Sequence, residues 1–146
     1  MKLLLLLHVA ATLVMFGVIL VVQIVHYPLF GQVGADGFRA YHAAHERLIT
    51  VVVGVPMLIE LATAVWLVWA RPFGLPGWMV WTGLGLVAVL WLSTALLQIP
   101  MHRVLQGGFD GAAHGRLVVT NWVRTLAWGA RAGLVLAMLA RLLRTP

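Results

Sequence analysis

Four long apolar stretches, separated by short polar segments, dominate the pattern of the chain. They cover residues 3–25, 48–70, 78–99 and 117–139. Each has about the 20 residues that an α-helix needs to cross a hydrocarbon layer about 30 Å thick. The pattern predicts an all-α integral membrane protein in which residues 1–146 form a single four-helix bundle domain.

Polar residues mark where the four helices begin and end. Asp36 and Asp110 each precede a glycine and a short polar stretch, which is typical of a capped helix start outside the hydrocarbon. We therefore expect the second and fourth helices to begin near residues 37 and 111. Pro28 and Pro100 follow the first and third stretches, so we expect those two spans to end close to these prolines.

One short motif, His-x-Arg-Leu, occurs twice, at residues 45–48 and 114–117. Each copy follows one of the two prolines and precedes an apolar stretch. This repetition predicts two tandem helical hairpins, related as a parallel pseudo-repeat. The polar connections within both hairpins then lie on the same side of the membrane.

Composition supports the membrane interpretation. Hydrophobic residues make up 62% of the chain and charged residues 10%, against about 45–50% and about 25% in soluble domains. The first stretch continues to Val25, beyond the length of a signal-peptide core, so we expect a retained span. The formal charge of +6 is spread over both ends of the bundle, which favours a lipid bilayer as partner and not nucleic acid.

Orientation follows only weakly from the charges. With an even number of spans, both termini and the loop around Arg71 share one side. Lys and Arg residues are equally numerous on the two sides, so the positive-inside rule gives a tie. We expect a bacterial inner membrane protein with both termini cytoplasmic, because the arginines on the other side have acidic neighbours and can serve a site.

Aromatic residues mark two expected membrane interfaces. The belt near Arg71 comprises Trp66, Trp69, Trp78 and Trp81, and the opposite belt comprises Tyr27, Phe30, Phe38, Tyr41 and Phe109.

Histidines converge at the end of the bundle opposite the termini. His42 and His45 lie three residues apart, and Glu46 follows His42 by four, so these side chains share one helix face. The five histidines at this end come from all four helices and are His26, His42, His45, His102 and His114. His8 belongs to the opposite leaflet, where we expect it to stand alone.

Such convergence is what a metal or haem site in a helical bundle requires. Neutral imidazoles suit zinc, copper or iron, and we expect iron, copper or haem here. Glu46 or Asp110 is the candidate further ligand, and Glu46 is also the candidate catalytic base. The alternative is that these histidines only hydrogen-bond headgroups, water or helix ends at the interface. Their spacing matches neither the zinc-protease motif nor the soluble di-iron motif.

Three ionisable residues, Glu60, Arg124 and Arg131, lie within the apolar spans, where charges are costly and face the bundle interior. The helical rise separates Glu60 from His42 by about 27 Å, so the two cannot share one ion. We expect Glu60 to form a buried ion pair with Arg131 or Arg124. That pair either neutralises charge and fixes packing, or serves a proton path or an anionic or quinone-like ligand.

Asn121 lies on the face of the fourth helix that carries His114, two turns farther along. It is a candidate hydrogen-bond donor behind the histidines. With Arg124, it completes the predicted cofactor-binding set.

Five segments carry a resemblance to known proteins: residues 26–30 (HYPLF), 41–47 (YHAAHER), 98–102 (QIPMH), 108–110 (GFD) and 121–124 (NWVR). In them the chain resembles small bacterial four-span membrane proteins, and in overall plan it is similar to the anthrone-oxygenase-like membrane family. The resemblance implies a four-helix bundle that acts with oxygen on a lipophilic phenolic substrate. It transfers no catalytic motif residue by residue.

Three classes of function remain. The first is a membrane oxidoreductase or oxygenase that holds a metal ion or haem and acts on a lipophilic substrate. The second is a non-catalytic accessory subunit of a larger membrane complex. The third is a small proton or cation transporter or channel, for which four helices require a homo-oligomer. Histidine convergence favours the first class, and small size favours the second.

Overall fold

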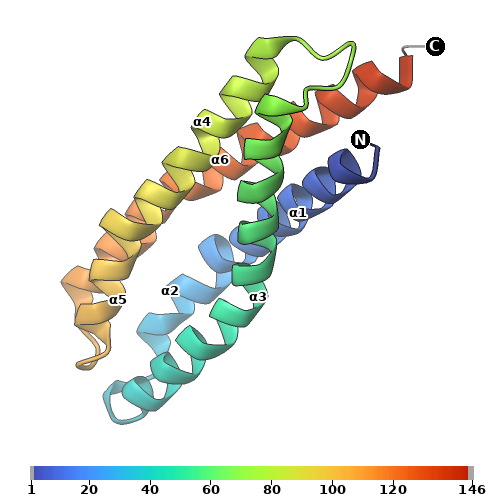
Figure 1. The fold of residues 1–146 in the computed structure, drawn as a ribbon. Helices are drawn as coiled ribbons and strands as arrows, with labels where there is room; N and C mark the ends of the chain where they lie inside the picture. The colour runs from blue at the N-terminus through green and yellow to red at the C-terminus, as the bar shows by residue number, and fades with distance from the viewer. Residues whose placement is uncertain (1, 145–146) are drawn as a thin grey trace.

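Four long helices make up the computed structural model, which describes residues 2–144 (Figure 1). The first helix runs without interruption through α1 (Lys2–Val21), η1 (Val22–His26), α2 (Tyr27–Leu29) and η2 (Phe30–Gln32), and the second is α3 (Ala35–Trp69). The third comprises α4 (Gly77–Ser93), η3 (Thr94–Gln98) and α5 (Ile99–Leu105), and the fourth is α6 (Gly111–Arg144). All four are long and apolar enough to cross a membrane. The all-helical prediction is confirmed, and the helices indicate an integral membrane protein.

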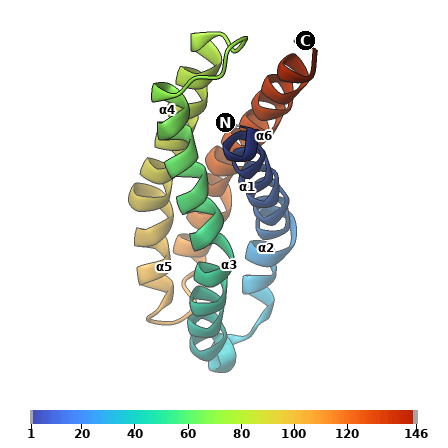
Figure 2. The same cartoon turned by 45° about the vertical axis from the view of Figure 1, so that its right-hand side comes forward.

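The helices form a four-sided bundle. α1 packs against α3 and α6, and α4 packs against the same two helices from the other side. Both chain ends lie beside the α3–α4 connection, and the other two connections lie at the opposite end (Figures 1 and 2). We call these the terminal end, with residues 70–76, and the histidine end, with residues 33–34 and 106–110.

The first and third helices continue past the prolines near which the sequence predicts their ends. A π-helical turn precedes each proline: the backbone N–H of Tyr27 donates to the Val22 carbonyl, and that of Ile99 donates to the Thr94 carbonyl. Proline has no N–H, and its ring crowds the carbonyl four residues earlier. A wider turn relieves this crowding, so the helix continues.

The two expected helix caps differ. The Asp110 side chain accepts a hydrogen bond of 2.7 Å from the Ala113 N–H and so caps the start of α6. Asp36 instead lies inside the first turn of α3, where Gly34 precedes the helix with a positive φ of 80°. A carboxylate in a first turn still opposes the positive end of the helix dipole.

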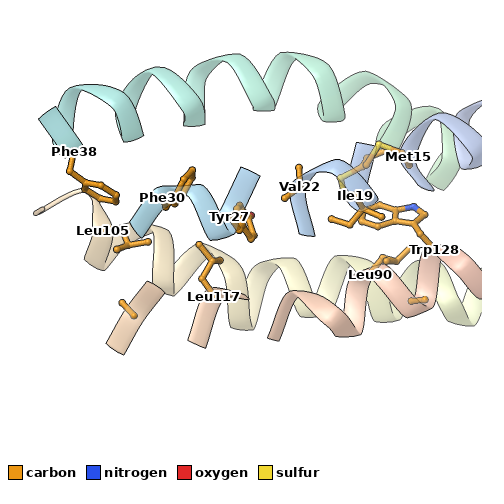
Figure 3. Close-up of a cluster of buried hydrophobic side chains, with 13 residues drawn as sticks. Met15, Ile19, Val22, Tyr27, Phe30, Phe38, Leu90, Leu105, Leu117 and Trp128 are labelled. Atoms are coloured by element: carbon orange, nitrogen blue, oxygen red, sulfur yellow. The ribbon is translucent and has the colours of Figure 1, made fainter. Parts of the chain in front are cut away.

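An aromatic and aliphatic core follows the bundle axis. Figure 3 shows this core extending from Phe38 to Trp128, with Tyr27 and Phe30 projecting from the first helix between α3 and the α5–α6 pair. Phe30, Phe38 and Trp128 are completely buried. The prediction of Tyr27, Phe30 and Phe38 as an interfacial belt is therefore wrong. The first helix continues past Pro28 and turns Tyr27 and Phe30 inward, and Phe38 is buried from the first turns of α3, where its ring contacts Phe30. The belt of four tryptophans near Arg71 is exposed, as expected.

Substitution of Phe30 by alanine should destabilise the bundle in detergent by about 3–5 kcal/mol, because it removes a fully buried aromatic ring. The matched control is Phe73→Ala in the α3–α4 loop, where the side chain is 97% exposed and the change should stay within about 0.5 kcal/mol. Thermal unfolding followed by circular dichroism measures both. Equal losses would contradict the assignment of Phe30 to the core.

Candidate functional site

Three predicted site residues meet at the histidine end. His42 and Glu46 lie one turn apart on α3, and His102 faces them from α5. The Nε2 atom of His42 lies 3.0 Å from the Nδ1 atom of His102, and the Nδ1 atom of His42 lies 3.6 Å from a Glu46 carboxylate oxygen. Each of the three residues offers one ligand atom, and these atoms lie within 4.8 Å of one another. This group could hold a metal ion.

One set of tautomers satisfies a chain of contacts through these residues. The Tyr27 hydroxyl donates to Nε2 of His102 at 3.0 Å, which places the His102 proton on Nδ1, where it is donated to His42. His42 then carries its own proton on Nδ1, on the side of Glu46. The Gln106 amide donates to both Glu46 oxygens, at 3.0 and 3.2 Å, and holds this carboxylate in place.

A second histidine pair lies beside the first. The Nε2 atom of His26 lies 2.7 Å from the Nδ1 atom of His45, and the rings of His45 and His102 stack with centroids 5.9 Å apart. Among residues 2–144, Nδ1 of His42 and Nε2 of His45 are buried without a hydrogen-bond partner. The first faces Glu46 at 3.6 Å. Buried polar atoms are rarely left unpaired, so Nε2 of His45 is the nitrogen that favours a ligand.

The Phe30 ring packs against the histidine cluster. Its ring makes edge contacts with His26, His42 and His45 at centroid distances of 5.0–5.7 Å. Packing of this kind fixes the rotamers of the histidines, which a preorganised site requires.

His114 has a different environment from the other four histidines at this end. Its Nε2–H donates to the Tyr27 carbonyl at 2.8 Å, and its ring packs against Phe30 and Phe109. It therefore ties α6 to the carbonyl end of the first helix. In the structure it lies outside the group of His42, Glu46 and His102.

A cavity of about 240 Å³ borders Glu46 and His102 and reaches inward to Met15 and Ile19. The polar side chains that line it include Tyr27, Glu46, Gln98, His102 and Arg124. Arg124 is 7% exposed and donates to the Asn121 side-chain oxygen at 3.1 Å.

Asn121 and Arg124 are thus neighbours, but Asn121 turns away from the histidines. Its amide donates to the Gln23 side chain at 2.9 Å, and Gln23 in turn donates to the Val118 carbonyl at 3.1 Å. This network joins the first helix to α6. Arg124 is the member that reaches the cavity.

A separate polar network lies near the terminal end and connects all four helices. Of the two arginines expected near Glu60, Arg131 forms the ion pair, with Nε 2.8 Å from the carboxylate. Arg131 also donates to the Gly83 carbonyl on α4. Oε1 of Glu60, the oxygen that pairs with Arg131, also accepts a hydrogen bond of 2.8 Å from the Thr12 hydroxyl on α1. Oε2 accepts a hydrogen bond of 3.0 Å from the Trp128 indole.

His8 belongs to this network, so the expectation that it stands alone is wrong. Its Nδ1 lies 2.7 Å from the Thr63 hydroxyl, and its Nε2 lies 3.4 Å from Arg131. The helix that carries His8 is apolar on all sides, so periodicity does not indicate which face turns inward. A histidine within a leucine run was itself the available signal, because such a residue in a membrane span faces a polar partner.

Sequence reasoning also missed Tyr27, Gln23 and Gln98 as polar residues of the interior. Gln23 and Gln98 are buried, and each lies in the π-helical turn before a proline. Amides within apolar spans were the signal for both. For Tyr27 the signal was weaker, because a tyrosine near a span end is typical of the interface.

The chain matches no protein-family model, and neither a curated protein nor a solved structure is significantly similar to it.

Glu60→Gln should destabilise the protein by about 3–5 kcal/mol, because it leaves the Arg131 charge buried without its partner. The double variant Glu60→Gln with Arg131→Met should lose less stability than the sum of the two single changes, by about 0.5–3 kcal/mol. Unfolding in detergent measures the cycle, with Arg47→Gln, an exposed arginine on α3, as control. Additive losses would show that the two side chains do not interact.

Proposed function

We propose that this protein is a membrane-embedded oxidoreductase that binds a transition-metal ion through His42, Glu46 and His102 and oxidises a lipophilic substrate. The observation that carries the proposal is the set of three donor atoms, from two helices, within 4.8 Å of one another. Imidazole nitrogen with a carboxylate is a donor set suited to iron and copper. Placement on two packed helices gives the rigidity that such a site needs.

The spacing of the two imidazoles also fits a metal ion. Two nitrogen ligands of a tetrahedral metal, each about 2.0–2.1 Å from it, lie about 3.3 Å apart. The 3.0 Å between His42 and His102 is close to this separation. Small rotations of the two rings would therefore turn both nitrogens toward a bound metal ion. The unpaired Nε2 of His45 is the candidate additional donor.

A metal ion is favoured over haem as the cofactor. A haem held by two histidines needs a flat slot between their rings, whereas the His42 and His102 rings already share a hydrogen bond and have centroids 5.2 Å apart. Bound iron or copper supplies one-electron chemistry, and the resemblance to the anthrone-oxygenase-like family supports dioxygen as the acceptor. Glu46 lines the cavity, and the carboxylate oxygen of Glu46 that does not bind the metal ion is the candidate base.

A groove between α1 and α3 supports the proposal that the substrate is lipophilic. Its volume is about 510 Å³, and its walls are mainly aliphatic side chains, including Val21, Leu48 and Val52. His26 and His45 lie at its histidine end. A groove with apolar walls on the outside of a membrane bundle admits molecules that dissolve in the bilayer.

We further propose that the two hairpins are copies of one ancestral hairpin. In both, the first helix contains a π-helical turn directly before the residue that precedes a proline. Independent origin of the same irregularity at the same place is less economical than duplication.

For the orientation, we propose a bacterial inner membrane with both termini in the cytoplasm. Arg39, at the histidine end, donates to the Gly107 carbonyl at 2.7 Å. Because this arginine stabilises the structure there, we leave it out of the count of Lys and Arg residues that sets orientation. The terminal end then has more of these residues than the histidine end, which favours the terminal end as the cytoplasmic one.

His42→Ala and His102→Ala should each lower the affinity for copper or iron by at least about 100-fold, because each removes a ligand, and even changes behind the ligands cost about 10–100-fold. Chelator competition and elemental analysis of detergent-purified protein measure this affinity.

The matched control is His114→Ala, which removes a histidine at the same end but outside the ligand group. It should retain the wild-type metal content. The metal proposal is wrong if the folded wild type takes up no metal, or if the three variants lose metal to the same extent.

Single cysteines test the orientation, because the chain has none of its own. With the termini in the cytoplasm, Gln32→Cys at the histidine end should react with a membrane-impermeant maleimide in intact spheroplasts. Phe73→Cys at the terminal end should react only after permeabilisation. The reverse pattern would place the termini outside.

A further inference from the structure

Arg124 is a buried cation that lacks an acidic partner. It is 7% exposed, and no carboxylate lies within salt-bridge distance of it among residues 2–144. Its recorded contacts are neutral: the Asn121 oxygen at 3.1 Å, the Trp128 ring at 5.2 Å and the Tyr27 side chain. A charge in a membrane interior is costly and faces a partner or a water-filled space.

Arg131, about two turns farther along α6, is an example of a fully paired arginine in this bundle. It has a carboxylate, a carbonyl, a hydroxyl and an imidazole as partners. Arg124 Nε, in contrast, is buried with no partner at all. Residues 2–144 therefore include two buried arginines and one buried acid, and that acid, Glu60, is paired with Arg131.

The unpaired cation lines the cavity that also reaches His102 and Glu46. The volume of about 240 Å³ equals that of about eight water molecules in the liquid, which suits one aromatic ring with a small substituent. The remaining lining is mixed, with Met15, Ile19 and Val53 among its apolar side chains and a second arginine, Arg103, among its polar ones. Arg103 is exposed. The cavity thus offers one buried cation, Arg124, with apolar side chains for the ring of a ligand.

We infer that Arg124 binds the anionic oxygen of a small, single-ring organic anion in this cavity. The inference deepens the proposed function, on which it rests for the role of the ligand: the bound anion is the head of the substrate, beside the metal ligands His102 and Glu46. Guanidinium binds oxyanions through paired, charge-assisted hydrogen bonds. The anion supplies the counter-charge that the chain itself does not provide.

Benzoate, titrated calorimetrically into metal-free protein in detergent, tests the inference. The wild type should bind benzoate at least about tenfold more tightly than the neutral analogue benzyl alcohol, because only the anion pairs with Arg124. Arg124→Gln should weaken benzoate binding at least about tenfold and abolish this preference. Arg116→Gln removes the same charge from an exposed position on α6 and should change nothing.

A second variant covers the case in which Arg124→Gln does not fold. Val53→Phe fills the cavity and leaves Arg124 in place, and it should abolish benzoate binding. Wild-type affinity for benzoate in Val53→Phe, or in folded Arg124→Gln, would overturn the inference, and so would the absence of benzoate binding to the wild type.

The same titration with metal-loaded protein separates the two proposals. Arg124-dependent binding to protein that takes up no metal would support the anion site and reject the metal function. Binding that appears only with metal, and equally in Arg124→Gln, would place the anion on the metal and overturn the inference while the metal function stands.

Discussion

The ion pair between Arg131 and Glu60 is the interaction on which the arrangement of the bundle depends. In a hydrocarbon environment, polar groups find partners only within the protein. Arg131 reaches Glu60 on α3, the Gly83 carbonyl on α4, and Thr12 and His8 on α1. One side chain of α6 therefore fixes the rotation of the other three helices. Wrong rotation of any helix leaves a buried polar group unpaired, at a cost of several kcal/mol.

That rotation determines what faces inward at the histidine end. Glu60 and His42 are separated by about five helical turns at 3.6 residues per turn, so both project from nearly the same face of α3. Fixing Glu60 toward the bundle axis thus also directs His42 and, one turn on, His45 toward the axis. The same rotation of α3 therefore places Glu60 in the polar network near the terminal end and His42 in the imidazole cluster.

The sequence was sufficient to predict the helices, their end-to-end arrangement and the pairing of Glu60 with a buried arginine, because each follows from the cost of polar groups in hydrocarbon. It also predicted that His42, Glu46 and His102 lie close together, since helical spacing and topology define their depth. It could not predict the π-helical turns before Pro28 and Pro100, because proline usually ends a helix and the alternative depends on tertiary packing. The inward orientation of Tyr27 and Phe30 follows from that continuation, and so it was missed as well.

The position of Trp128 has a consequence for the electrical isolation of the membrane. Trp128 is fully buried; its indole N–H is bonded to Glu60, and its ring lies under the guanidinium of Arg124. Together with Met15, Ile19 and Leu90, which share its core cluster, its ring forms an apolar layer between the cavity and the polar network of Arg131. Such a layer opposes the passage of ions and protons, because charged groups are costly to move into apolar surroundings. We therefore expect the proposed chemistry to exchange protons only with the aqueous compartment at the histidine end.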